Sequence, residues 1–219
     1  MNIVRKQKSY RELNLTDMDG KHKKISEHRM NQKADCKLTE VAKLFETTLP
    51  GYCVANISPF LSKILQMNKC GPVEKIHLLY DVENRFAAIS YNLLIQTNYH
   101  CKETEEYQFE VQYKGILQVH SAKFVSYSKT AVMDERGQKI LNTLNEPIIL
   151  NKICKLNLMQ VLVVYSERNQ CWKVSLKSLS GSSTWILIPP VMNLIQPERQ
   201  EIFEWVELLQ MLVSVVSTV

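Results

Sequence analysis

Hydrophobic residues first recur with a helical period in two stretches. In the first, four apolar residues follow the candidate N-cap Asp35 at i, i+3, i+4 and i+7: Leu38, Val41, Ala42 and Phe45. The second opens with Ser58-Pro59, an N-cap followed by a first-turn proline, and its apolar stripe contains Phe60, Leu61, Ile64 and Leu65. The pattern predicts two short helices, each with one buried face.

From about residue 75 to residue 130 the period changes to two. Apolar residues alternate with polar ones over 87–99, which predicts a long strand with one packed face. The acidic run that contains Glu103, Glu105 and Glu106 is expected to be a solvated turn. Alternation resumes from Tyr107 to Tyr113 and continues past Gly115, and 123–131 predicts a further strand. A glycine inside such a strand indicates a bend, so we expect a curved antiparallel sheet.

The rest of the chain predicts two helices and two more strands. Residues 138–145 favour a short helix after the turn at 134–137, and the nearly all-apolar run 158–165 predicts a strand covered on both faces. A hairpin loop at 166–170 leads into alternation over 172–178. A final amphipathic helix begins at Pro197, and its apolar stretch is too short for a bilayer, which needs about 20 such residues. We expect this helix to pack on the sheet.

All of the net charge of +5 lies in the first 33 residues. Residues 34–219 carry equal numbers of basic and acidic side chains and are expected to form a single α+β domain, in which one C-terminal and two N-terminal helices cover the sheet. Residues 1–33 lack a sustained period, so we expect a mobile basic tail. The candidate polyanion-binding residues are Arg5, Lys6, Lys8, Arg11, Lys21, Lys23, Lys24, Arg29 and Lys33.

No motif indicates catalysis, a cofactor or a metal. The six glycines are too far apart for a phosphate-binding loop, and the six cysteines form no C-x-x-C pair. His100 and Cys101 are adjacent, and on a strand they would project to opposite faces. We therefore expect no catalytic, cofactor-binding or metal-binding residues. The start of the chain lacks a secretory signal, which predicts an intracellular protein, cytoplasmic or nuclear, with reduced cysteines.

Tyrosines on the predicted sheet raise a second possibility, because exposed rings can stack on unpaired bases. Tyr107 and Tyr113 are the candidate stacking residues. Against this interpretation, the expected domain carries no net charge, whereas a sheet that follows a phosphate backbone usually supplies its own positive groove.

These observations favour a non-enzymatic assembly or adaptor protein. It would join protein partners through sheet edges or the last helix, with self-association open, while residues 1–33 dock on an anionic membrane, a nucleic acid or an acidic protein. The organisation is similar to that of small viral matrix proteins, although no motif matches. The alternatives are a nucleic-acid-binding module that uses the tail and the tyrosines, and a small enzyme with an unrecognised Cys/His site.

Overall fold

The computed structural model describes residues 17–55, 59–67, 73–85, 88–103, 105–114, 121–127, 133–156, 158–186 and 191–218. Four helices and nine strands occur in this part of the chain. They follow in the order α1 (Asp17–Thr48), β1 (Tyr52–Val54), β2 (Ser62–Met67), β3 (Lys75–Arg85), β4 (Ala88–His100), β5 (Tyr107–Lys114), β6 (Ser121–Ser126), α2 (Glu135–Leu144), α3 (Pro147–Lys155), β7 (Leu158–Ser166), β8 (Cys171–Ile186), β9 (Val191–Leu194) and α4 (Arg199–Thr218).

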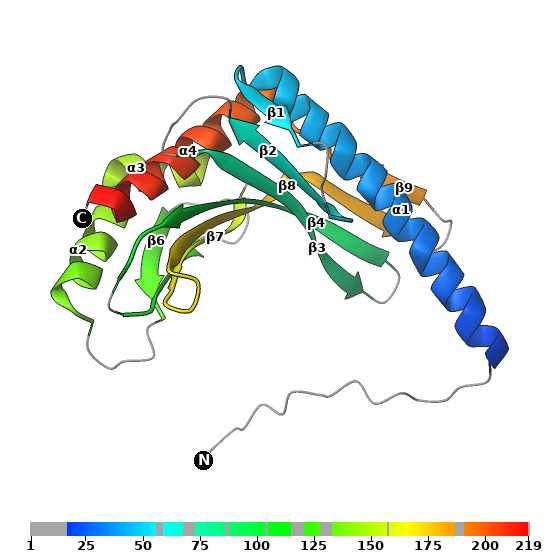
Figure 1. Cartoon of the computed structure of the whole chain (residues 1–219), viewed down its shortest axis with the longest axis horizontal. Helices are drawn as coiled ribbons and strands as arrows, with labels where there is room; N and C mark the ends of the chain where they lie inside the picture. Colours follow the sequence, from blue (N-terminus) through cyan, green and yellow to red (C-terminus); the bar gives the residue numbers. More distant parts are fainter. Residues whose placement is uncertain are drawn as a thin grey trace, which may run out of the picture.

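The strands form one arched antiparallel sheet in the order β1-β2-β3-β4-β8-β7-β5-β6, with β9 added beside the second half of β8. Figure 1 shows all four described helices along the outer side of the arch, and no described helix beneath its inner side. The sheet therefore has a helix-covered face and an open face. The predicted α+β class and the curved antiparallel sheet are confirmed.

Alternation along the central strands explains why one face is covered. On β4, Tyr91, Leu93 and Ile95 are fully buried beneath the helices, while the intervening residues face the open side. On the neighbouring β8, Trp172 and Val174 continue the buried row. The helices close the core over this row. Phe45 of α1 and Trp205 of α4 stack there with ring centroids 5.9 Å apart, which joins the first helix to the last.

A bend in β8 allows it to pair with β7 in its first half and with β9 in its second half. The bend lies at Gly181, whose φ of +80° is unfavourable for residues with a side chain. A Cβ there would also lie 2.4 Å from Cδ2 of Leu93. The Ser182 hydroxyl accepts a hydrogen bond from the Leu93 N–H at 2.8 Å, where the register between β4 and β8 shifts. This bend contributes to the arch.

The N-terminal predictions need correction. A single 32-residue helix, α1, replaces the first predicted helix and extends back to Asp17, so the expected tail boundary at residue 33 falls inside a helix. The predicted stripe holds, because Leu38 and Phe45 are fully buried, and Met30 and Ala34 extend it upstream. Asp35 is not a cap. The residue lies in the interior of the α1 segment, and its carboxylate accepts a hydrogen bond from the Leu61 N–H and pairs with Lys63.

The second predicted helix is wrong, because residues 62–67 form β2, which pairs with β3. Its apolar run is too short for periodicity to separate helix from strand, and tertiary pairing decided the outcome. The predicted strand at 123–131 is β6, displaced toward the N-terminus. The sequence patterns predicted no separate element for β1, β3, α3 or β9. The long strand at 87–99, the 138–145 helix, the 166–170 hairpin and the last helix are confirmed as β4, α2, the β7–β8 turn and α4.

Candidate functional site

A groove runs between α1 and β9 and has a volume of about 600 Å³. We call it the α1 groove. Its lining comes mainly from one face of α1, and β9 contributes Met192. The α1 residues in the lining are Arg29, Gln32, Lys33, Cys36, Lys37 and Glu40. Spacings of three and four residues place these side chains along one helix face.

Basic side chains dominate the α1 groove. Arg29 and Lys33 are exposed one helical turn apart, and the Lys33 ammonium lies 4.8 Å from the ring centroid of Trp185, a cation–π distance. Lys37 forms an ion pair with Glu40 at 3.0 Å, which partly neutralises it. Arg29 and Lys33 therefore supply most of the positive potential of the groove.

The structure places only some of the predicted polyanion-binding residues. Arg29 and Lys33 lie together on α1 and line the groove. Lys21, Lys23 and Lys24 lie in the first turns of the same helix, but their side chains are outside the described part, as are Arg5, Lys6, Lys8 and Arg11 altogether. The sequence reasoning missed Lys37 and Met192. The i, i+4 spacing of Arg29, Lys33 and Lys37 carried a signal for the first of these.

The predicted base-stacking tyrosines lie on the helix-covered face. Tyr107 is 3% exposed and stacks on Trp172 at a centroid distance of 5.5 Å. Tyr113 packs against the same core, and its hydroxyl is buried without a hydrogen-bond partner in the described part of the chain. Burial raises the pKa of both phenols. Both rings pack against the core beneath the helices and are not displayed on the open face of the sheet, so this prediction is wrong.

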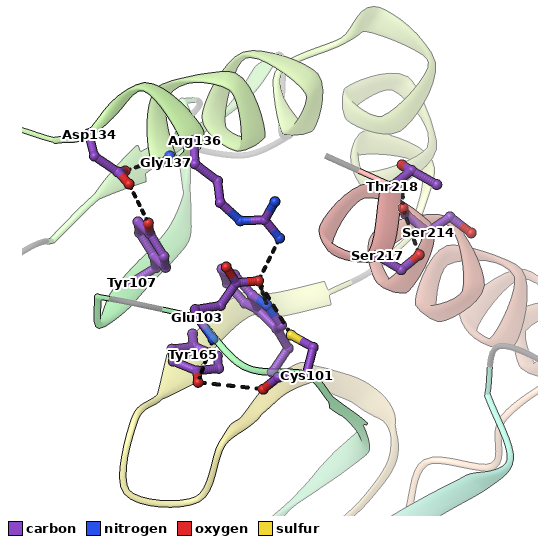
Figure 2. A network of polar contacts seen from close by, with 11 residues as sticks. Cys101, Glu103, Tyr107, Asp134, Arg136, Gly137, Tyr165, Ser214, Ser217 and Thr218 are labelled. Atoms are coloured by element: carbon purple, nitrogen blue, oxygen red, sulfur yellow. Dashed lines mark hydrogen bonds and ion pairs between the residues drawn. The ribbon is translucent and has the colours of Figure 1, made fainter.

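A buried carboxylate holds the loop after β4 against α2 (Figure 2). The Glu103 side chain is 5% exposed, and its Oε1 accepts hydrogen bonds from Arg136 Nη2 at 2.6 Å, Trp172 Nε1 at 3.2 Å and Cys101 Sγ at 3.3 Å. The Glu103 N–H donates to the Tyr165 hydroxyl at 2.9 Å. The expectation that Glu103 belongs to a solvated turn is wrong, because α2 brings a guanidinium to it.

The Glu103 cluster stabilises the fold and is not suited to nucleophilic catalysis. Burial alone would raise the pKa of Glu103, but hydrogen bonds from Arg136, Trp172 and Cys101 hold it below its ordinary value. Burial, together with the hydrogen bond to Glu103 and its charge, raises the pKa of the Cys101 thiol to about 11. Cys101 is therefore a thiol at neutral pH and a poor nucleophile. Within the described residues, no group of three or more His, Cys, Asp or Glu is arranged to hold a metal ion.

His100 and Cys101 do not act together, because His100 is exposed on the open face whereas Cys101 packs toward the core. The sheet register instead places His100 directly across from Cys171 on β8. No hydrogen bond joins these two side chains among the described contacts, and no carboxylate orients the imidazole there. This arrangement lacks the parts of a nucleophile–base pair.

Side chains cap backbone amides at two sheet edges. On β6, the Asn145 side chain accepts from the Phe124 N–H at 2.8 Å and donates to the Phe124 carbonyl at 3.1 Å, as a neighbouring strand would. On β1, the Val54 N–H donates to Glu46 at 2.9 Å. Each contact satisfies the backbone of one residue at its edge, and docking of partners at the sheet edges stays a prediction. Most of the apolar side chains of α4 are also buried, and Phe203, which is 46% exposed, is the large apolar residue of this helix that a partner could reach among those described.

Within the described residues, no helix is both long enough and apolar enough to span a bilayer.

Residues 65–216 match the model of a family described as a protein of unknown function, DUF3156. No curated protein and no solved structure matches the chain. The matched segment begins in β2 and ends in α4, so it contains most of the sheet, α2 and α3 but excludes α1. Because it covers more than half of the 219 residues, the chain belongs to the DUF3156 family.

Proposed function

We propose that this protein is a non-enzymatic adaptor that holds an acidic segment of a partner protein in the α1 groove. The observation that carries the proposal is the composition of that groove, in which exposed cations of one helix face an apolar side chain of β9. Arg29 and Lys33 would pair with carboxylates, and Met192 would contact an apolar residue of the same segment.

An acidic peptide fits this groove better than an anionic membrane or a nucleic acid does. A flat bilayer would meet the rim of the groove and leave its hollow unfilled. A nucleic acid would gain phosphate contacts, but of the tyrosines that would stack on bases Tyr107 is buried and Tyr113 is half-buried on the covered face. A peptide can enter the hollow and use both its charged and its apolar parts.

The test is fluorescence anisotropy with a short labelled peptide of alternating Glu and Leu. The double variant Arg29→Glu/Lys33→Glu is expected to weaken binding by about tenfold, because each reversal removes one attraction and adds one repulsion. The matched control is Lys43→Glu/Lys139→Glu, which makes the same charge change at two exposed positions outside the α1 groove. It should bind almost as tightly as the unaltered protein.

Two parallel measurements use phosphatidylserine vesicles and a single-stranded oligonucleotide. Peptide binding that depends on Arg29 and Lys33 supports the proposal. An equal loss of peptide affinity in both double variants would show that only net charge matters and would overturn the proposal. Binding to vesicles or to the oligonucleotide without binding to the peptide would overturn it as well.

A further inference from the structure

The open face of the sheet contains a second hollow, of about 460 Å³. We call it the open-face hollow. Six of the side chains that line it are His77, Gln96, Asn98, His100, Asn169 and Lys173. The register places His77 across from Gln96 and Asn98 across from Lys173, and β7 also contributes to the lining, so four adjacent strands form the floor. Asn169 comes from the β7–β8 turn, which lies beneath the arch in Figure 1.

The charge of this hollow is one-sided. None of the nine described residues that line it is Asp or Glu, whereas they include one lysine and two histidines. Lys177 provides an internal comparison, because it lies on the same face of the same strand. Its ammonium pairs with Asp81 at 2.8 Å and with Glu83 at 2.6 Å. Lys173 has no carboxylate partner in the described part of the chain, so its charge is available to a ligand.

The polar side chains around Lys173 also form no hydrogen bonds with the rest of the described chain. Within the described residues, the side chains of His77, Gln96, Asn98, His100 and Asn169 make no hydrogen bond to another residue. The Glu103 cluster on the covered side shows the opposite arrangement, where three donors converge on one carboxylate oxygen. One ammonium and several hydrogen-bond donors therefore line the same hollow, and such groups form the charge-assisted hydrogen bonds that hold an anion.

We propose that the open-face hollow binds a small organic oxyanion, a phosphate or carboxylate carried on a polar body. Lys173 supplies the charge, His77 and the amides of Asn98 and Asn169 supply hydrogen bonds, and the volume lies within the range of small-molecule sites. This site is separate from the α1 groove and stands independently of the adaptor function. It also lies wholly within the residues that match the family model.

Protonation of His77 should be coupled to binding. Burial, followed by the charges of Lys75 and Lys173, holds the pKa of His77 below its ordinary value. His100 also faces the hollow, and the neighbouring strand β2 presents Ser62, Ile64 and Gln66, none of which is charged. An anion placed between His77 and Lys173 would raise the pKa of His77. By linkage, affinity should increase as the pH falls through that pKa.

The experiment measures binding by calorimetry with two matched pairs of probes: glycerol phosphate against glycerol, and glucuronate against glucose. At least one anion of the two pairs should bind, and its neutral counterpart should not. The variant Lys173→Met keeps the length of the side chain and removes its charge, and it should weaken binding by about tenfold, the loss expected for one charge-assisted contact. In parallel, the NMR titration of His77 should shift to a higher pKa on binding.

The control is Lys123→Met, an exposed position on the open face of β6 that lies outside the hollow. It should leave affinity unchanged, and thermal unfolding should show that both variants remain folded. The proposal is overturned if neither anion binds, if the neutral partner binds as tightly, or if Lys173→Met and Lys123→Met bind alike. A pKa of His77 that stays unchanged on binding would place the anion elsewhere and overturn it too.

Discussion

The Glu103 cluster and the open-face hollow lie on opposite sides of one sheet. The charge of the first is paired within the described part of the protein, and the charge of the second is not. Glu103 is almost fully buried, yet three donors satisfy one of its oxygens, so the charge is compensated within the fold. Lys173 is exposed in a hollow with other donors and without a carboxylate. A charged group whose hydrogen bonds are made within the fold stabilises the fold, whereas an exposed charge beside other donors can bind a ligand.

The sharpest test of this comparison uses two adjacent residues of β8, because Trp172 faces the covered side and Lys173 the open side. Trp172→Ala should lower the free energy of unfolding by about 4 kcal/mol, since it removes a fully buried ring and a donor to Glu103. Lys173→Ala should change it by less than about 0.5 kcal/mol. Urea denaturation measures both, and similar losses would show that the two faces do not differ in this way.

A smaller effect is expected for Arg136→Ala, which leaves Glu103 buried without its guanidinium. Breaking a fully buried pair costs about 3–5 kcal/mol, and the partial exposure of Arg136 reduces the expected loss to about 2 kcal/mol at neutral pH. The exposed Arg168→Ala is the matched control and should have almost no effect.

The pH dependence of this loss provides its own check. In the unaltered protein the folded pKa of Glu103 is depressed, so its stabilising contribution is complete above the unfolded pKa and is lost as the pH falls. In Arg136→Ala, burial would dominate and favour the protonated carboxyl. The difference in unfolding free energy between the two proteins should therefore shrink in acid. A difference that stays constant with pH would mean that Arg136 acts through packing alone.

The sequence patterns predicted the covered face better than either binding surface. The alternation that contains Tyr91, Leu93 and Ile95 identified β4 because one buried row repeats every second residue. The extent of β8 was not predictable, since its continuation past Gly181 depends on contacts with Leu93 and on the Ser182 hydroxyl. The predicted strand therefore ends at residue 178, whereas β8 continues to Ile186.

The α1 groove and the open-face hollow were not predicted for a different reason. The open-face hollow joins His77 to Lys173, residues almost a hundred positions apart, and only the strand order β3-β4-β8 brings them together. Glu103 was similarly placed among solvated acids because its partner Arg136 lies on a helix whose position depends on tertiary packing. Arg29 and Lys33 were recognised as basic, but their i, i+4 spacing indicates a shared face only where the segment is helical, and residues 1–33 were expected to be a mobile tail.

The smallest expected effect concerns His77, whose pKa depends first on burial and then on Lys75 and Lys173. Lys173→Met should raise the pKa of His77 only part of the way to its ordinary value, because burial and Lys75 remain. Lys123→Met should leave it unchanged, and NMR titration of the imidazole distinguishes the two. Because the folded pKa is depressed, the unfolded chain takes up a proton more readily, so stability should fall as the pH drops below the unfolded value of about 6.5. Lys173→Met should reduce that acid-side loss, since the same cation that would attract an anionic ligand also opposes the imidazolium.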